Sequence, residues 1–204
     1  MSRSQGRPAR TTVQDVSTHD TASGKVILLI GPSSAGKSTL CRAIQQRTDE
    51  PFIRYSLDFF FDSDALPTHR SDGPFAWREQ RPKLFEGYFR SLAALASAGN
   101  NLVLDFVIET PQQLTRLVTL LRPFDVFLVG VHCPLPELER RERARGNRRL
   151  GDAHRDLETV HTFTTYDFEV DSTHPVDENA DRVIHAWQQR TEPGILQRLA
   201  ARDA

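Results

Sequence analysis

Cysteine, lysine and long apolar runs are all scarce in this 204-residue sequence. Its two cysteines, Cys41 and Cys133, fall in segments that should be packed, and such usage favours reduced thiols in a cytoplasmic protein over a disulfide scaffold. No apolar run resembles a secretory signal or a membrane span, so we expect no membrane association. The formal net charge of −1 provides no overall field that attracts nucleic acid, and we expect no nucleic-acid partner.

The N-terminal segment has very few apolar side chains and consists mainly of Ser, Thr, Arg, Gln and Asp. It cannot bury enough apolar surface to offset the entropy lost on ordering, so we predict a disordered leader over residues 1–24. Its arginines resemble those of a transit peptide, but Asp15, Asp20 and the missing amphipathic face argue against one. Residues 25–204 are long enough for one α/β domain, and we predict a single domain there.

The chain has three lysines against 23 arginines, and one of the three, Lys37, lies in a phosphate-binding motif. Residues 31–38 read Gly-Pro-Ser-Ser-Ala-Gly-Lys-Ser, which matches the pattern GxxxxGK followed by Ser or Thr. An apolar run precedes the motif and helix-forming residues follow it, which is the context in which this pattern wraps nucleotide phosphates. We therefore predict ATP as the nucleotide, with Lys37 on the β- and γ-phosphates and Ser38 on Mg²⁺. The residues predicted to bind the nucleotide are Gly31, Pro32, Ser33, Ser34, Ala35, Gly36, Lys37, Ser38 and Thr39.

Apolar runs alternate with segments of helical period along the rest of the chain. The predicted strands are residues 26–30, 52–57, 102–107, 126–131 and 168–170. The predicted helices are residues 38–47, 77–98, 111–121, 135–145, 151–160 and 176–190. Such alternation is typical of a parallel sheet with helices on both faces. We predict an α/β fold, a P-loop NTPase of nucleoside-kinase type, built as a three-layer sandwich around a five-stranded parallel sheet; the polar connection 60–75 is expected to face a substrate.

Two aspartates are expected at the carboxyl ends of strands, where open α/β sheets bind their ligands. Asp58 closes the second predicted strand, which we expect beside the strand of the phosphate loop, so that its carboxylate can accept the proton of an acceptor hydroxyl; a cap or turn role is the alternative. Asp105 ends the apolar run 102–104 of the third predicted strand and is predicted to face the metal, directly or through water, with a turn or cap role as the alternative. Glu109 and Asp62 are weaker candidates, because both are also consistent with solvated loop charges.

An arginine-dense stretch over residues 139–149 follows the fourth predicted strand by one helix. Small P-loop kinases carry a lid at that place, whose arginines close over the triphosphate and exclude water, so we predict a short Arg-rich lid around residues 140–155. Arg145 and Arg148, on either side of a helix break, are the predicted functional pair. The remaining charges of the stretch, Glu142 among them, are predicted to form a solvated helix face.

The histidines near these segments show no metal-ligand spacing. His132 ends the fourth predicted strand, and we interpret it as a packed or hydrogen-bonded strand-end histidine. His154 and His161 have no partner at ligand spacing either. The loop 171–175 is predicted from topology alone to border the adenine.

Five segments together resemble the chloramphenicol phosphotransferase-like family over residues 25–190. They are the phosphate loop, the Asp58 segment, and residues 129–135, 142–148 and 166–173. The resemblance implies a P-loop kinase that uses ATP and Mg²⁺ to phosphorylate a hydroxyl of a small molecule, the founding activity being inactivation of an antibiotic, with Asp58 as the proposed base. The chain departs from the family pattern after Asp58, in a Phe-rich loop that contains Asp62 and Asp64, and at Asn147, where an aspartate is usual.

We therefore predict an enzyme, an ATP-dependent O-phosphotransferase that phosphorylates a hydroxyl of a small antibiotic-like molecule. The aromatic residues around the 60–75 connection suit an acceptor with a flat or apolar part, or equally a core anchor: Phe59, Phe60, Phe61, Phe75 and Trp77. A P-loop kinase of a primary metabolite or nucleoside would share the loop and the lid, so it stays open. A non-catalytic nucleotide-dependent switch also stays open, although the sequence has no guanine-reading Asn-Lys-x-Asp pattern. The sequence does not decide whether the chain forms a homo-oligomer.

Overall fold

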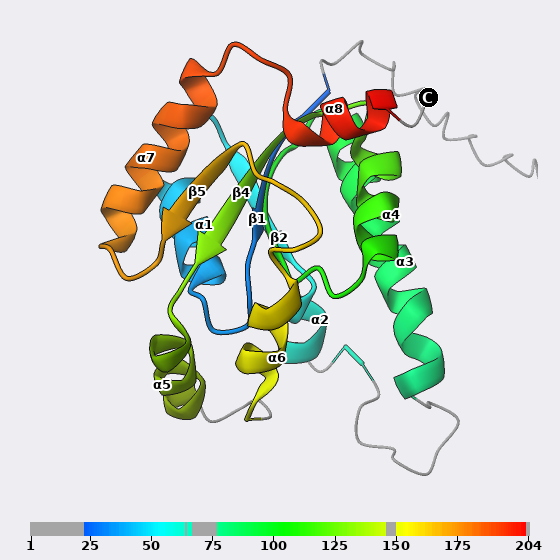
Figure 1. Cartoon of the computed structure of the whole chain (residues 1–204). Coiled ribbons are helices and arrows are strands. Elements are labelled where there is room, and N and C mark those ends of the chain that lie inside the picture. Colours follow the sequence, from blue (N-terminus) through cyan, green and yellow to red (C-terminus); the bar gives the residue numbers. More distant parts are fainter. Residues whose placement is uncertain (1–22, 64, 67–76, 146–149, 203–204) are drawn as a thin grey trace, which may run out of the picture.

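Five parallel strands form the centre of the molecule in the order β2-β3-β1-β4-β5 (Figure 1). The computed structural model describes residues 23–63, 65–66, 77–145 and 150–202, and the structural statements below concern these residues. The strands are β1 (Lys25–Ile30), β2 (Phe52–Ser56), β3 (Asn101–Phe106), β4 (Asp125–His132) and β5 (Phe168–Asp171). The helices are α1 (Lys37–Arg47), α2 (Asp58–Asp62), α3 (Trp77–Ser97), α4 (Pro111–Leu121), α5 (Leu135–Arg145), α6 (Asp152–Thr159), α7 (Val176–Gln189) and α8 (Ile195–Arg202).

Helices cover both faces of this sheet. α3, α4 and α8 pack on one face, and α1 and α7 pack on the other (Figure 1). Because both faces are covered, the inner strands need apolar side chains at successive positions, and residues 26–30 of β1 are all fully buried. The predicted three-layer α/β fold with a five-stranded parallel sheet is therefore confirmed.

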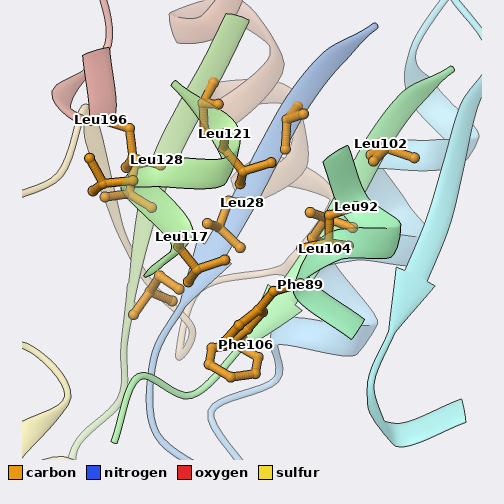
Figure 2. Packing of buried hydrophobic residues seen from close by; sticks show 14 of the residues in the cluster. Leu28, Phe89, Leu92, Leu102, Leu104, Phe106, Leu117, Leu121, Leu128 and Leu196 are labelled. Carbon is orange, nitrogen blue, oxygen red and sulfur yellow. The ribbon is translucent and has the colours of Figure 1, made fainter. Parts of the chain in front are cut away.

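Leucine side chains from three strands and three helices meet in one of the two core clusters (Figure 2). The strand residues are Leu28, Leu104 and Leu128, and the helix residues are Leu92, Leu117 and Leu196. Burial of each such side chain stabilises the fold by roughly 1.5–3 kcal/mol. This cluster fixes α3, α4 and α8 against the sheet, and it thereby gives the carboxyl edge of the strands a rigid support.

Every strand and helix predicted from the sequence is present, with ends within one residue of the prediction. Two further helices, α2 and α8, were not predicted. α2 is preceded by Leu57, which makes no side-chain cap, so the sequence carries no start signal for it. At α8 the capping carboxylate comes from far upstream, because Oδ1 of Asp167 accepts the N–H of Ile195 at 2.7 Å.

The predicted position of the second strand was wrong. β2 lies at the edge of the sheet, and β3 separates it from β1. The burial pattern explains this order: β3 is buried along most of its length, as an inner strand must be, whereas β2 leaves Ile53 41% exposed. Asp58 does not close β2 either, since the strand ends at Ser56 and Asp58 begins α2. Ser56 still pairs in register with Asp105, so both aspartates lie near the same edge.

Most of the predicted leader lies outside the described residues. At its end the backbone N–H of Gly24 donates to the carbonyl oxygen of Ala96 at 2.8 Å, which ties the start of β1 to α3. Most of the polar connection 60–75 also lies outside the described residues, beyond α2. Among the helices that the structure describes, none combines the length and apolarity needed to cross a membrane.

Candidate active site

The turn from β1 to α1 has the shape of a phosphate-binding loop. Gly36 has a φ of 88° and Ser34 a φ of 63°, both in the left-handed region that glycine adopts without strain and serine adopts rarely. Gly31 allows close packing, because a Cβ there would lie 2.4 Å from a backbone carbonyl oxygen of β4. Nζ of the buried Lys37 donates to the carbonyl oxygen of Pro32 at 2.8 Å. The loop therefore holds an ammonium at the N-terminus of α1, where backbone N–H groups attract anions.

Ser38 in the first turn of α1 and Asp105 on β3 form a pair of oxygen ligands beside this loop. Oγ of Ser38 donates to Oδ2 of Asp105 at 2.6 Å. The other carboxylate oxygen of Asp105, Oδ1, is buried and has no hydrogen-bond partner among the described residues. Magnesium binds one or two protein oxygens of this hard type, while phosphates and water complete its shell, so the two side chains fit such an ion. In the part of the chain that the structure describes, no group of three or more His, Cys, Asp or Glu side chains is arranged to hold a metal ion.

Asp58 lies in the first turn of α2, and its backbone N–H donates to Oγ of Ser56 at 3.3 Å. Leu57 occupies the N-cap position, and Asp58 is the first residue of the helix. The register of β2 and β3 places Ser56 opposite Asp105. Asp58 is thus brought to the carboxyl edge by a turn after an edge strand.

A cavity of 1140 Å³ brings the predicted side chains together at this edge. Lys37, Ser38, Asp58, Asp105 and Arg145 all line it. Its volume exceeds the range of about 300–1,000 Å³ that is usual for one small ligand. It has room for a nucleotide and a second small molecule. Of the predicted nucleotide-binding residues, Ser33, Ser34, Gly36 and Thr39 also line the cavity, whereas Gly31, Pro32 and Ala35 are buried in the turn itself.

Of the two arginines predicted for the lid, only Arg145 lies within the described residues. Arg145 ends α5, is exposed and lines the cavity, while Arg148 lies outside the described residues. Glu142 corrects the prediction of a solvated helix face, because it is only 4% exposed and accepts the N–H groups of Gly151 at 2.8 Å and Ala153 at 3.0 Å. Burial raises the pKa of Glu142, but these backbone hydrogen bonds lower it more, and its pKa lies below the usual value. The carboxylate therefore stays charged and caps the start of α6.

Arg141 lines the cavity, although the sequence predicts it as one of the solvated charges of the helix face. Its Nη1 donates to the carbonyl oxygen of Ala35 at 3.3 Å and to Oγ of Ser172 at 3.1 Å, and its Nη2 donates to the carbonyl oxygen of Ser172 at 2.9 Å. Nε contacts Glu137 at 2.7 Å. Arg141 thus ties the phosphate loop to the loop predicted to border the adenine. No spacing in the sequence indicates this contact, because Arg141 and Ala35 are 106 residues apart.

The part of the cavity near α3 combines aromatic rings with an ion pair. Phe61 and Phe85 line it, and Nη2 of Arg81 lies 2.6 Å from a carboxylate oxygen of Glu109 while its guanidinium stacks over Phe85. Asp62, the other weaker candidate, also lines the cavity. Two further rings of the predicted aromatic set point elsewhere: Arg54 stacks over Phe59, and Phe60 packs on the core. Phe75 and the side chain of Trp77 lie outside the described residues.

Of the histidines in the described part of the chain, none lines the cavity. Nε2 of His132 lies 2.5 Å from Glu169, and its ring stacks on that of His161 with centroids 4.1 Å apart, as expected for a strand-end histidine. Nδ1 of His161 is 2.7 Å from the hydroxyl of Tyr166. Burial, and then the neighbouring His132, lower the pKa of His161 to about 4. His154 is exposed on α6 and lies 3.8 Å from Glu158.

Comparison with known proteins relates this chain to one family and to two relatives with similar names. The model of the family described as chloramphenicol phosphotransferase-like protein matches residues 24–188. Two proteins of Mycobacterium tuberculosis, from strains CDC 1551 and H37Rv, each carry the name "Putative O-phosphotransferase". Each is 30% identical over 202 residues, which cover 88% of this chain and 89% of the relative.

Solved structures share the fold at lower identity. The APS kinase CysC of Mycobacterium tuberculosis, in complex with AMPPNP and APS, has a TM-score of 0.62 at 18% identity, over 82% of this chain and 99% of that one. The tunicamycin resistance protein of Deinococcus radiodurans has a TM-score of 0.59 at 17% identity, over 79% and 94%. A gluconokinase from Sinorhizobium meliloti has a TM-score of 0.54 at 13% identity, over 90% and 99%. At such identities the likeness concerns the fold, and the predicted P-loop kinase fold is confirmed.

Proposed function

This chain belongs to the chloramphenicol phosphotransferase-like family and is a phosphotransferase, and we propose that it transfers the γ-phosphate of ATP to a hydroxyl group of a small antibiotic-like molecule. One observation carries the proposal: a single cavity is lined by the loop lysine, by a serine–aspartate pair that fits Mg²⁺, and by a separate aspartate on α2. An anion site, a cation site and a base in one cavity are what phosphoryl transfer to an alcohol requires.

The nucleotide end of the cavity supplies positive charge. Lys37 exchanges its hydrogen bond with Pro32 for the β- and γ-phosphates. Ser38 and Asp105 would hold Mg²⁺, and the ion would supply positive charge that offsets the charge of the phosphates. Arg145 and Arg148 of the lid stabilise the charge that develops on the transferred group and help to exclude water.

Asp58 acts at the acceptor end. Its carboxylate accepts the proton of the acceptor hydroxyl as the oxygen attacks the γ-phosphorus. The new bond joins that oxygen to phosphorus, and the bond from the γ-phosphorus to the bridging oxygen of the β-phosphate breaks. The products are the phosphate ester and ADP, and the proton stays on Asp58 until it passes to water.

The aromatic rings favour an acceptor with a flat or apolar part. Phe61 and Phe85 bring apolar ring surface to the cavity, and the ion pair of Arg81 with Glu109 offers polar contacts beside them. An antibiotic-like alcohol combines both features. A primary metabolite or nucleoside is the competing acceptor class, and a switch that transfers phosphate to nothing is the third alternative.

The test is a transfer assay with the whole chain, ATP and Mg²⁺ across hydroxylated antibiotics, common metabolites and nucleosides, with products identified by mass. We expect one antibiotic class to gain the mass of a phosphoryl group, and the Lys37→Ala variant to give no product. Transfer to a metabolite or nucleoside alone would keep the chemistry and overturn the antibiotic-like acceptor. ATP binding without transfer to any acceptor of the panel would favour the switch.

A further inference from the structure

A buried carboxylate of the lid helix α6 touches the phosphate loop and has no role in the chemistry described above. The side chain of Asp156 is 5% exposed and lines the cavity. Its Oδ2 accepts the backbone N–H of Ser33 at 3.1 Å, and its Oδ1 accepts from Nη2 of Arg155 at 3.2 Å. The residues in contact are 123 positions apart in the chain, so only the fold brings them together.

The negative charge of Asp156 makes its position beside the phosphate loop unfavourable for two reasons. The phosphate loop exists to hold a polyanion, and a second anion beside it opposes that binding. Burying a carboxylate is unfavourable as well, and it is tolerated where hydrogen bonds and an ion pair compensate. Arg155 supplies the ion pair, and the N–H of Ser33 supplies the hydrogen bond.

Ser33 is the point at which a single hydrogen bond can fix the shape of the loop. The residue before it, Pro32, carries the carbonyl oxygen that holds Lys37. The residue after it, Ser34, has the positive φ of 63° that sets the direction of the following N–H groups. A carboxylate that fixes the amide between them therefore restrains both the lysine anchor and the turn.

Further contacts fix the start of the helix that carries Asp156 and the loop that it touches. Glu142 of α5 caps the start of α6, and Ala153 in its first turn is fully buried. Arg141, also on α5, holds the carbonyl oxygen of Ala35 in the same loop. Figure 1 shows α6 next to the turn between β1 and α1, as this contact requires.

We propose that Asp156 is a positioning residue, which holds the phosphate loop at Ser33 in the shape that receives the β- and γ-phosphates. The proposal rests on the nucleotide use of the proposed function and is independent of the acceptor. A ligand with all three phosphates then depends on Asp156, whereas AMP, which lacks the outer two, does not.

The test compares ATP and AMP binding by calorimetry, with Mg²⁺, in the whole chain and three variants. Asp156→Ala removes the acceptor of the Ser33 N–H, and we expect ATP to bind about tenfold or more weakly while AMP changes by less than about twofold, since a hydrogen bond to a charged group is worth a tenfold effect or more. Asp156→Asn keeps an oxygen acceptor, and we expect it to restore ATP affinity to within about threefold of the original chain. Glu158→Ala, on the same helix at a side chain 64% exposed, is the matched control and should change neither affinity.

Amide exchange at Ser33, followed by NMR, reports the contact without any ligand. We expect faster exchange in Asp156→Ala and near-normal exchange in Asp156→Asn. Tighter ATP binding in both Asp156 variants would mean that the carboxylate competes with phosphate, and it would overturn the proposal. Equal losses for ATP and AMP, equal losses in the Ala and Asn variants, or failure of the unaltered chain to bind ATP would also overturn it. Failure to find an acceptor, with ATP binding intact, would count against the proposed function. The comparison of ATP and AMP binding in the Asp156 variants would still test the role of Asp156.

Discussion

Asp58 is the base of the proposed reaction, and its position at the start of α2 and in the lining of the cavity makes that role testable. We expect Asp58→Asn to lower kcat by about a hundredfold to ten-thousandfold, because the amide cannot accept the proton. ATP affinity should change by less than about twofold, because Asp58 is proposed to act on the acceptor hydroxyl and the nucleotide is proposed to bind at Lys37 and Ser38. Single-turnover transfer and calorimetric ATP binding measure the two effects separately.

Asp62 at the other end of α2 is the matched variant, because it also lines the cavity. Asp62→Asn should cost less than about tenfold in kcat, in line with a carboxylate that shapes the site without taking the proton. A larger loss for Asp62 than for Asp58 would move the base to Asp62. Unchanged turnover in Asp58→Asn would remove Asp58 from the mechanism.

Asp105 gives a second prediction for a single residue, because its buried Oδ1 has no hydrogen-bond partner among the described residues. If the carboxylate faces Mg²⁺, directly or through water, Asp105→Asn should raise the Mg²⁺ concentration for half-maximal activity by about tenfold to a hundredfold. Titration of activity with Mg²⁺ at saturating ATP measures this shift. Ser38→Ala should act in the same direction. An unchanged Mg²⁺ requirement in both variants would show that the pair is structural.

Local sequence reveals some of these residues and not others. Lys37 and Ser38 are predicted because the motif contains them at fixed spacing, and Asp105 because it ends an apolar run. Arg141, Glu142 and Asp156 are not predicted, since each has a partner on another segment of the chain. Their roles follow from packing, and in sequence they look like ordinary charges of solvated helices.

At the scale of elements, the strands and long helices follow from hydrophobic period, because a parallel sheet covered on both faces needs continuous apolar runs. The order of the strands does not follow from period, and the position of β2 was predicted wrongly. The half-exposed pattern of β2 was the available signal for an edge strand. The short helices α2 and α8 lack a local start signal, since one has no side-chain cap and the other is capped by a distant residue.

The junction of α5 and α6 depends on Glu142, which caps one helix from the other. We expect Glu142→Ala to lower the free energy of unfolding by about 1–3 kcal/mol, because two backbone N–H groups lose their acceptor at a buried position. Urea denaturation measures the change, and hydrogen exchange should localise it to α6. Glu139→Ala, which removes an exposed partner of Arg143 on the same helix, is the control and should cost less than about 0.5 kcal/mol. Equal losses in the two variants would contradict the capping role.

The same cap makes this junction sensitive to acid. Because the pKa of Glu142 is lower in the folded chain than its usual value of 4.5, the unfolded chain takes up the proton first. The contribution of Glu142 to stability is therefore present above about pH 4.5 and is lost as the pH falls through the lowered pKa. Loss of exchange protection in α6 should accompany that titration, and Glu142→Ala should abolish this pH dependence.

At the scale of the molecule, the two core clusters stabilise the fold, and the cavity contains the residues of the candidate site. The clusters fix helices on each face of the sheet, and the cavity opens at the edge where the phosphate loop, β3, α5 and α6 meet. Hydrogen bonds of Arg141 on α5 and Asp156 on α6 join these two helices to the phosphate loop. The nucleotide site is thus tied to the global fold, so global stability and site geometry respond to the same packing.

His161 makes global stability depend on pH in a range where carboxylates do not titrate strongly. Its folded pKa of about 4 is below the ordinary value of 6.5, because burial and then His132 disfavour the charged ring. Between these two values the unfolded chain binds a proton at His161 and the folded chain does not. The free energy of unfolding therefore falls as the pH is lowered from 7 to 5.

We expect His161→Phe to reduce this fall by about 1 kcal/mol, a value that allows for the partial exposure of the ring. The absolute stability of the variant can differ for other reasons, such as the lost contact with Tyr166, so the measured quantity is the difference between urea unfolding at pH 7 and at pH 5. His154→Phe, at an exposed histidine of α6, should leave that difference unchanged. If His161→Phe and the original chain lose the same free energy between the two pH values, the ring at position 161 titrates alike in both states, and its burial does not carry the acid sensitivity.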